Sequence, residues 1–258
     1  MTVAVGVANL VLGLVYCQYG TMTLIEMRRH WRSMGFSHFG AAWIAMAFTC
    51  GPHHLVHGLH LLTTGAAAGS LDLTAVLIGF PAGVIWFVLR VEAFRGGAGD
   101  RFVSGNPLWV LALPTIAGIY LTALVAIIAQ SGTLDTRHLA AVAPNLLLVP
   151  IYSTIGYYLV RTQLANRRPL GGWSVSGLAL AVIFPTCAVM HAIYAYYSLG
   201  GAYGPAVHTT VIDWFAVPAG IYFLWVVHAL YRGTFRDWNR GAALRAAAQR
   251  APQEATAA

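Results

Sequence analysis

Residues 9–20 read NLVLGLVYCQYG and residues 145–156 read NLLLVPIYSTIG, so five of the twelve positions are identical. The shared residues are an asparagine, two leucines, a tyrosine and a glycine, and neither segment contains a charged side chain. Self-similarity at a fixed spacing is the sequence signature of an internal repeat. We therefore expect the fold to be built from two related halves.

Two further pairs of segments match in the same order, with a spacing one residue longer. Thr49-Cys50-x3-His54 matches Thr186-Cys187-x3-His191, and Pro81-Ala82-Gly83 matches Pro218-Ala219-Gly220. A single match between apolar helices arises easily by chance, but three matches in order do not. They predict one repeat at about 1–97 and a second at about 137–232, joined by a linker helix at about 107–129.

The composition excludes a water-soluble globule. Hydrophobic residues make up 58% of the chain and charged residues 9%, and the mean hydropathy is +0.67. Too few polar side chains remain to cover a soluble protein. The chain is therefore expected to be an all-α integral membrane protein whose apolar surface contacts the lipid bilayer. Its apolar stretches predict seven transmembrane helices, at about 4–27, 39–62, 73–94, 107–129, 138–160, 173–198 and 207–231.

The distribution of arginine predicts the orientation of these spans. The chain contains no lysine, and fourteen of its fifteen arginines follow the first, third, fifth and seventh spans, while Arg137 alone lies on the other side. By the positive-inside rule, the N-terminus is outside, and residues 233–258 form a cytoplasmic tail at a cell (inner or plasma) membrane. Because one linker helix separates the repeats, both halves have the same orientation, and a pseudo-two-fold axis runs along the membrane normal. This three-plus-one-plus-three layout resembles the architecture of SWEET-type sugar transporters.

Several functions are excluded by the residues present. A retinal protein needs a lysine amine for its Schiff base, and the chain has no lysine. The net charge of +7 comes largely from the arginines that orient the spans in the membrane, so it does not indicate nucleic-acid binding. Three cysteines in separate apolar stretches argue against a disulfide framework.

The repeat places matched residues at equal depth on opposite sides of the axis, where one ligand can contact both. Cys50 and His54 are four residues apart and share one helix face, and the same holds for Cys187 and His191. Thiolate and imidazole bind zinc, copper(I) or iron, so these four residues predict a transition-metal site. Alternatively, His54 and His191 alone would be the axial ligands of a haem b.

Further polar residues are expected in the same half of the membrane. His53 and His57 are additional candidate metal ligands on the second span. Metal-binding imidazoles are usually held through their second ring nitrogen. The candidates for that role are Asn9, Asn145, His208 and Asp213. The alternative is structural: buried asparagine often only ties membrane helices together, and a buried histidine is often a hydrogen-bonded packing residue.

These features predict a membrane protein that binds a transition metal or haem between the second and sixth spans, near the outer face. It would act as a membrane oxidoreductase or a metal-dependent enzyme on a small-molecule substrate or redox partner that the sequence does not identify. The alternative from another class is a parallel-repeat transporter with a central, histidine-lined site for substrate or protons. A third interpretation is a subunit that packs in a homo-oligomer or a larger membrane complex.

Overall fold

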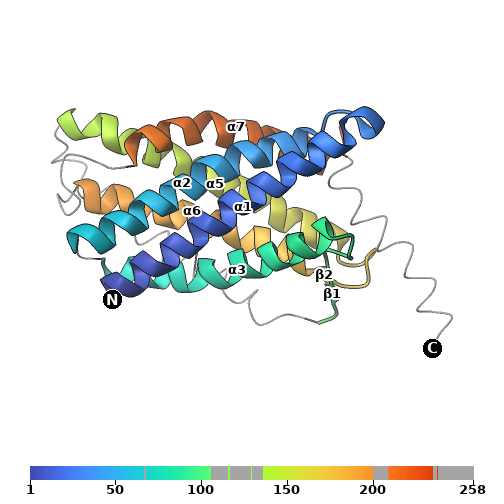
Figure 1. The fold of residues 1–258 in the computed structure, drawn as a ribbon, viewed down its shortest axis with the longest axis horizontal. Coiled ribbons are helices and arrows are strands. Elements are labelled where there is room, and N and C mark those ends of the chain that lie inside the picture. Colours follow the sequence, from blue (N-terminus) through green and yellow to red (C-terminus); the bar gives the residue numbers. More distant parts are fainter. Residues whose placement is uncertain are drawn as a thin grey trace.

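The computed structural model describes residues 1–66, 68–105, 116, 129, 136–199, 209–234 and 237, with only the backbone described for 136–141 and 197. Within these residues, six long helices lie side by side in an elongated bundle (Figure 1). The chain passes up and down the bundle through the first three helices, and again through the last three. The helices are α1 (Thr2–Met34), α2 (His38–Thr64), α3 (Ser70–Phe94), α5 (Thr136–Asn166), α6 (Val175–Leu199) and α7 (Thr210–Arg232).

The helix bounds agree with the predicted spans, except that α1 and α5 extend past their predicted ends, to Met34 and Asn166. The arginine-containing segments after both spans carry no helix breaker and therefore continue the helix. In α1 the break comes at Gly35, whose φ of 75° is left-handed and favours glycine. The arginine-rich ends of these helices thus project beyond their apolar stretches.

Five of the helices are long and apolar enough to cross a membrane: α1, α3, the 142–166 part of α5, α6 and α7. The 27-residue helix α2 is not among them, because its histidine-rich second half lowers its mean hydropathy. The predicted span at 107–129 lies almost wholly outside the described residues, as does most of the predicted tail at 233–258. The chain is therefore described as an all-helical, multi-pass membrane protein with five apolar helices.

The outer surface of the bundle is apolar, as expected for helices that face lipid. Large hydrophobic side chains are exposed on α3 and α7, including Leu77 at 64%, Val211 at 69% and Phe215 at 68%. In water, contiguous apolar surface of this kind would drive association, whereas hydrocarbon solvates it. The exposed side chains therefore support the membrane assignment that the composition predicts.

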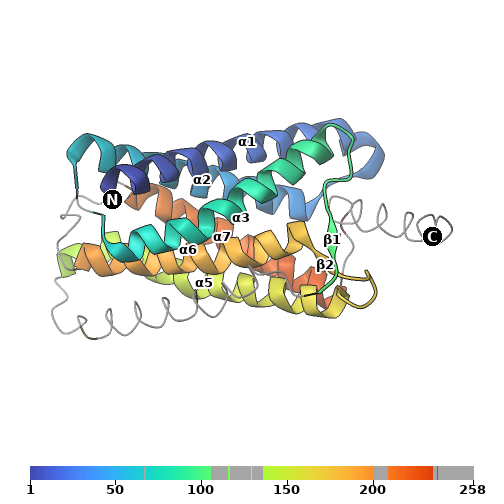
Figure 2. The ribbon, with the colours of Figure 1, turned by 90° about the horizontal axis from the view of Figure 1, so that it is seen from below.

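The six helices pack as two groups of three with the same internal contacts. Helix α1 packs on α2 and α3, and α5 packs on α6 and α7 in the same way. The groups are joined by contacts of α3 with α6 and of α2 with α7. In Figure 2, α6 runs below α3. Each contact in one group thus has a counterpart in the other.

Helices α1 and α2 approach each other closely because glycines face glycines. A Cβ atom added to Gly58 would lie 2.7 Å from the carbonyl oxygen of Gly6, and one added to Gly13 would lie 2.8 Å from that of Gly51. Small residues at such positions allow two backbones to make contact, which is a major source of affinity between helices in lipid. This contact fixes α2 against α1 at the level of the histidines.

The arginine-rich end of the bundle carries structure that the sequence patterns do not predict. Strand β1 (Phe102–Val103) pairs antiparallel with β2 (Trp173–Ser174). Just before β1, the carboxylate of Asp100 accepts hydrogen bonds from Oγ of Ser174 at 2.6 Å and from the backbone N–H of Ser176 at 2.9 Å. Asp100 therefore caps the first turn of α6 and fastens the segment after α3 to it.

The α1–α2 contact predicts a strong effect of a single methyl group. Gly58→Ala is expected to destabilise the detergent-solubilised protein by about 1–3 kcal/mol, because the new methyl meets backbone that cannot rotate away. In the control Gly83→Ala, the nearest atom is the side-chain Cδ2 of Leu12 at 2.8 Å, which can move, so the cost should be smaller. Thermal melting compares the two variants, and equal melting temperatures would contradict the described contact.

Candidate functional site

Three histidines from two helices lie together inside the bundle. His53 and His54 follow each other on α2, and His191 lies on α6; their exposed fractions are 8%, 4% and 6%. The ring centre of His53 is 5.8 Å from that of His54 and 5.1 Å from that of His191. They lie near the N-terminal part of α1, because the ring of His54 contacts Asn9 there and the ring of His53 packs against those of His54 and His191. We refer to His53, His54 and His191 as the histidine cluster.

Each matched histidine is held by the matched asparagine. Nδ1 of His54 lies 2.7 Å from Oδ1 of Asn9 on α1, and Nδ1 of His191 lies 2.6 Å from Oδ1 of Asn145 on α5. Both asparagines are completely buried. The two hydrogen bonds have the same atoms, the same helix pairing and nearly the same length. Asn9 and Asn145 thus each contact an imidazole, and their role beside a metal ion stays a prediction.

The asparagine contacts determine which ring nitrogen carries the proton. Nδ2 of Asn9 donates to the carbonyl oxygen of Val5 at 2.8 Å, and Nδ2 of Asn145 donates to the carboxylate of Asp213 at 3.0 Å. Both amides therefore present their oxygen to the imidazole, and an oxygen can only accept. Nδ1–H of each histidine must donate, so in the neutral ring Nε2 keeps a free lone pair. That lone pair can accept a proton or bind a metal ion.

A buried carboxylate completes the site. Asp213, in the first turn of α7, is fully buried, and its Oδ1 lies 2.6 Å from Nδ1 of His53. Its Oδ2 accepts from Oγ1 of Thr209 at 2.9 Å as well as from Asn145. Since a carboxylate only accepts, Nδ1–H of His53 donates here too. Three donors and the positive end of the α7 dipole stabilise the charge.

These contacts form one continuous hydrogen-bonded chain across four helices. It runs from His191 on α6 through Asn145 on α5 and Asp213 on α7 to His53 on α2. We refer to these four residues as the polar chain. Every member is buried, and each link is 3.0 Å or shorter.

The two halves differ at one place in this arrangement. By the spacing of the repeats, the counterpart of His53 is Met190 and the counterpart of Asp213 is Val76. Val76 and Met190 pack in one apolar cluster. The histidine–aspartate pair joins α2 to α7, and its counterpart, which joins α3 to α6, is an apolar contact. As a result Asn9, unlike Asn145, donates within its own helix.

The predicted cysteine ligands lie beside the histidine cluster. Sγ of Cys50 is 3.4 Å from the hydroxyl of Tyr152, whose ring packs 5.3 Å from that of His191. Cys50 and Cys187 line a common small cavity of about 20 Å³ together with Tyr16. The thiols therefore approach each other, but in the part of the chain that the structure describes, no three His, Cys, Asp or Glu side chains are close enough to hold a metal ion.

Two other predicted site residues have different outcomes. His57 is buried one turn from His53, and their ring centres are 6.2 Å apart. His208 lies outside the described residues.

The sequence analysis did not identify Thr209 and Tyr194 as site residues. The ring of Tyr194 packs against those of His53 and His57, with ring centres 5.8 and 5.5 Å apart. The position of Thr209, one turn before Asp213, is the signal that would have found it.

A layer of aromatic side chains lies between the histidine cluster and the arginine-rich end of the bundle. The ring of Trp86 is 4.0 Å from that of Tyr19 and 4.3 Å from that of Trp43, measured between ring centres. Phe184 and Phe223 stack at 5.0 Å and join the layer through Trp43. We refer to these five residues as the aromatic layer. It draws side chains from α1, α2, α3, α6 and α7, so it spans the bundle.

The order along α2 shows what the aromatic layer separates. Phe39 lines a cavity at the arginine-rich end, Trp43 belongs to the layer, Cys50 lines the small central cavity, and His54 belongs to the histidine cluster. At a rise of about 1.5 Å per residue, the histidines lie some 15 Å from the layer. The cluster and the cavity at the arginine-rich end therefore lie on opposite sides of an apolar barrier.

Comparisons with known proteins assign no family. No protein-family model matches the chain, and no curated protein and no solved structure matches it either. The function is therefore argued from the residues of this chain.

The pairing of His53 with Asp213 predicts a coupled response to mutation. His53→Met leaves the buried carboxylate one donor short and is expected to cost about 2–3 kcal/mol. The double variant His53→Met/Asp213→Val copies the equivalent contact of Val76 with Met190, and it should be more stable than the sum of the single variants implies. Denaturation of the wild type, both single variants and the double variant measures the coupling. Additive costs would contradict a direct interaction.

Proposed function

We propose that the chain is a membrane protein that binds one transition-metal ion through the imidazoles of the histidine cluster, with His54 and His191 as the principal ligands. The observation that carries the proposal is that each imidazole of the cluster donates its Nδ1–H to an oxygen atom, which leaves Nε2 free. Metal-binding histidines almost always have this second hydrogen bond, which sets the tautomer and orients the ring. Asn9, Asn145 and Asp213 supply it here.

The spacing of the rings supports a single ion. Two imidazoles on one tetrahedral ion, with metal–nitrogen bonds of about 2.0–2.1 Å, have ring centres about 5 Å apart. The separation of His53 and His191 is 5.1 Å. Since no three candidate ligands of the described residues are already close enough, binding requires rotation of these side chains. Copper or zinc suits an imidazole set best.

The other cofactor arrangements are less well supported. A haem b between His54 and His191 would have to displace the ring of His53, which packs against both. In a Cys2His2 site, Cys50 would give up its contact with Tyr152. We therefore propose His53, rather than Cys50 and Cys187, as the third ligand. The close packing around the rings favours electron transfer by copper over hydrolysis at zinc, because a redox ion needs no substrate cavity beside it, and zinc has no redox chemistry.

We further propose the architecture that the sequence predicts: seven spans, including α2 and 107–129, in two duplicated halves about a pseudo-two-fold axis, with the N-terminus outside. The matched Asn–His hydrogen bonds and the matched helix contacts support the duplication. Three of the histidines that lower the hydropathy of α2, namely His53, His54 and His57, are buried inside the bundle, so they do not oppose a membrane-spanning position. The orientation rests on the arginines, which gather at one end of the bundle.

A second candidate function is a transporter driven by protons. The polar chain favours it, since imidazole and carboxylate groups linked by hydrogen bonds inside a membrane are typical of proton relays. In this interpretation the free Nε2 atoms accept protons rather than a metal. Duplicated halves that rock about a central site would then give access to each face in turn.

Metal analysis tests the first proposal. Protein purified gently in detergent is expected to contain about one copper or zinc per chain by plasma mass spectrometry. His54→Ala and His191→Ala should each abolish this metal, and Asn145→Ala should weaken its binding roughly tenfold to a hundredfold. His228→Ala, at the arginine-rich end, is the matched control and should retain it. Metal retained in both histidine variants would disprove the proposal, and metal-free protein with proton-driven uptake in liposomes would favour the transporter.

Thiol labelling tests the proposed orientation. In a cysteine-free background, Ser70→Cys lies exposed at the start of α3, and Ser33→Cys lies exposed at the end of α1. An impermeant maleimide added to intact cells should label the first and not the second until the membrane is opened. The opposite pattern would place the N-terminus inside.

A further inference from the structure

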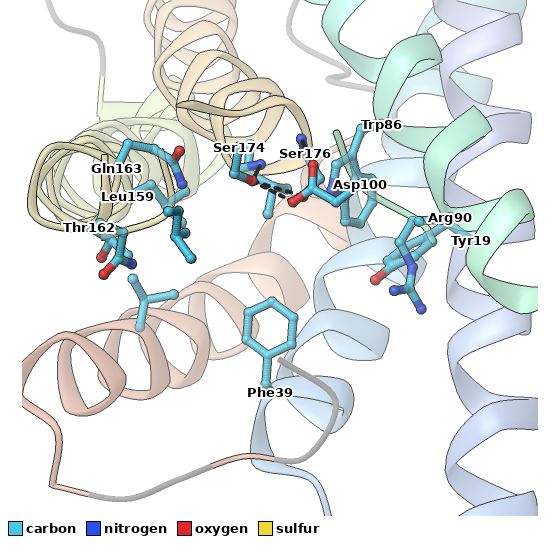
Figure 3. A pocket seen from close by; sticks show the side chains of 16 residues that line it. Tyr19, Phe39, Trp86, Arg90, Asp100, Leu159, Thr162, Gln163, Ser174 and Ser176 are labelled. Atoms are coloured by element: carbon cyan, nitrogen blue, oxygen red, sulfur yellow. Dashed lines mark hydrogen bonds between the residues drawn. The ribbon is translucent and has the colours of Figure 1, made fainter. Parts of the chain in front are cut away.

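A second polar site lies at the arginine-rich end, apart from the histidine cluster. Figure 3 shows a cavity of about 130 Å³ there, between Leu159 and Gln163 of α5 on one side and Tyr19, Trp86 and Arg90 of α1 and α3 on the other. Two members of the aromatic layer, Tyr19 and Trp86, thus form part of its wall. Nothing in the proposed metal site uses this cavity.

Arg90 has a hydrogen-bond donor that the described residues leave without a partner. Its Nη2 donates to a carboxylate oxygen of Glu26 at 2.7 Å, and its guanidinium carbon lies 5.3 Å from the ring centre of Tyr19. Its Nε is buried and has no acceptor. A buried donor without an acceptor is costly, so an oxygen atom brought by a ligand would be stabilised there.

The charges around the cavity decide which kind of oxygen fits. Glu26 already neutralises Arg90. Asp100 adds a negative charge to the lining, and its oxygens already accept from Ser174, from Ser176 and from the backbone N–H of Arg101 at 2.8 Å. An anionic ligand would therefore meet a site without net positive charge. A carbonyl or hydroxyl oxygen accepts the same hydrogen bond without that repulsion.

The size of the cavity limits the ligand to a small molecule. Cavities of about 150 Å³ hold one benzene ring, so about 130 Å³ corresponds to roughly six non-hydrogen atoms. The aromatic rings offer an apolar wall for a short hydrocarbon part. The Gln163 side chain offers amide groups on the opposite wall.

We propose that this cavity binds a small uncharged molecule with a carbonyl or hydroxyl oxygen, which accepts a hydrogen bond from Nε of Arg90. Its hydrocarbon part packs against Tyr19 and Trp86. The site is independent of metal binding, because the aromatic layer lies between the two.

Two probes of equal size test the proposal: butyramide, which is uncharged, and butyrate, which is an anion. Ligand-detected NMR on the full-length protein in detergent measures their binding. The key variant is Arg90→Lys, which keeps a cation for Glu26 but lacks Nε–H. Arg101→Lys is the matched control, because Arg101 forms an exposed ion pair with Glu92 and does not line the cavity.

Butyramide is expected to bind saturably to the wild type and to Arg101→Lys, and at least about tenfold more weakly to Arg90→Lys, because one hydrogen bond to a charged donor is lost. Butyrate should bind the wild type more weakly than butyramide. Absence of saturable butyramide binding, unchanged affinity in a folded Arg90→Lys variant, or preference for butyrate would each overturn the proposal. A melting curve of Arg90→Lys establishes that the variant is folded.

Discussion

The carboxylate of Asp213 imposes the strongest constraint on the part of the bundle that contains the histidine cluster. It is completely buried among helices whose outer surfaces are apolar, so it needs donors from within the protein. Those donors come from His53 on α2, Asn145 on α5 and Thr209 at the start of α7. Asn145 in turn holds His191 on α6. The positions of four helices are therefore tied to one acidic group.

In the duplication that we propose, the two halves of the bundle share a framework but differ where the polar chain passes. Asn9–His54 and Asn145–His191 are equivalent by sequence spacing, whereas His53 and Asp213 correspond to Met190 and Val76. Such a protein keeps its scaffold in both halves and places a costly buried charge in only one. The asymmetry makes His191 part of an extended network and leaves His54 with a local partner.

Much of this arrangement was predictable from the sequence, because the repeat carries information about residues far apart in the chain. Matching the halves indicated Asn9 and Asn145 as candidate partners of the imidazoles, and the expected depth of Asp213 in its span added that residue; each of the three contacts a histidine. The helices also lie where apolar runs predicted them. The pattern could not show whether Cys50 and Cys187 point at the same ion as the histidines, since a four-residue spacing fixes a face and not a side-chain direction.

The contacts at the arginine-rich end were not predictable for a different reason. The bond between Asp100 and Ser174 spans 74 positions, and that between Ser37 and Asp237 spans 200. Neither hydrogen bond belongs to a repeated or periodic sequence pattern, so the sequence near these residues does not predict it. Helix α2 falls short of the hydropathy of a candidate span for a related reason: three of its histidines, His53, His54 and His57, are buried inside the bundle, and an average over the helix does not show this.

The aromatic layer has an electrical consequence if the bundle spans a membrane. An electric field across a membrane falls mainly over the region of lowest dielectric constant, and the closely packed rings of Trp43, Trp86 and Phe184 form such a region. Each elementary charge that crosses the full field changes its energy by about 2.3 kcal/mol per 100 mV. A charge that moves between the histidines and the cavity at the arginine-rich end crosses this layer, so its movement would be sensitive to the membrane voltage.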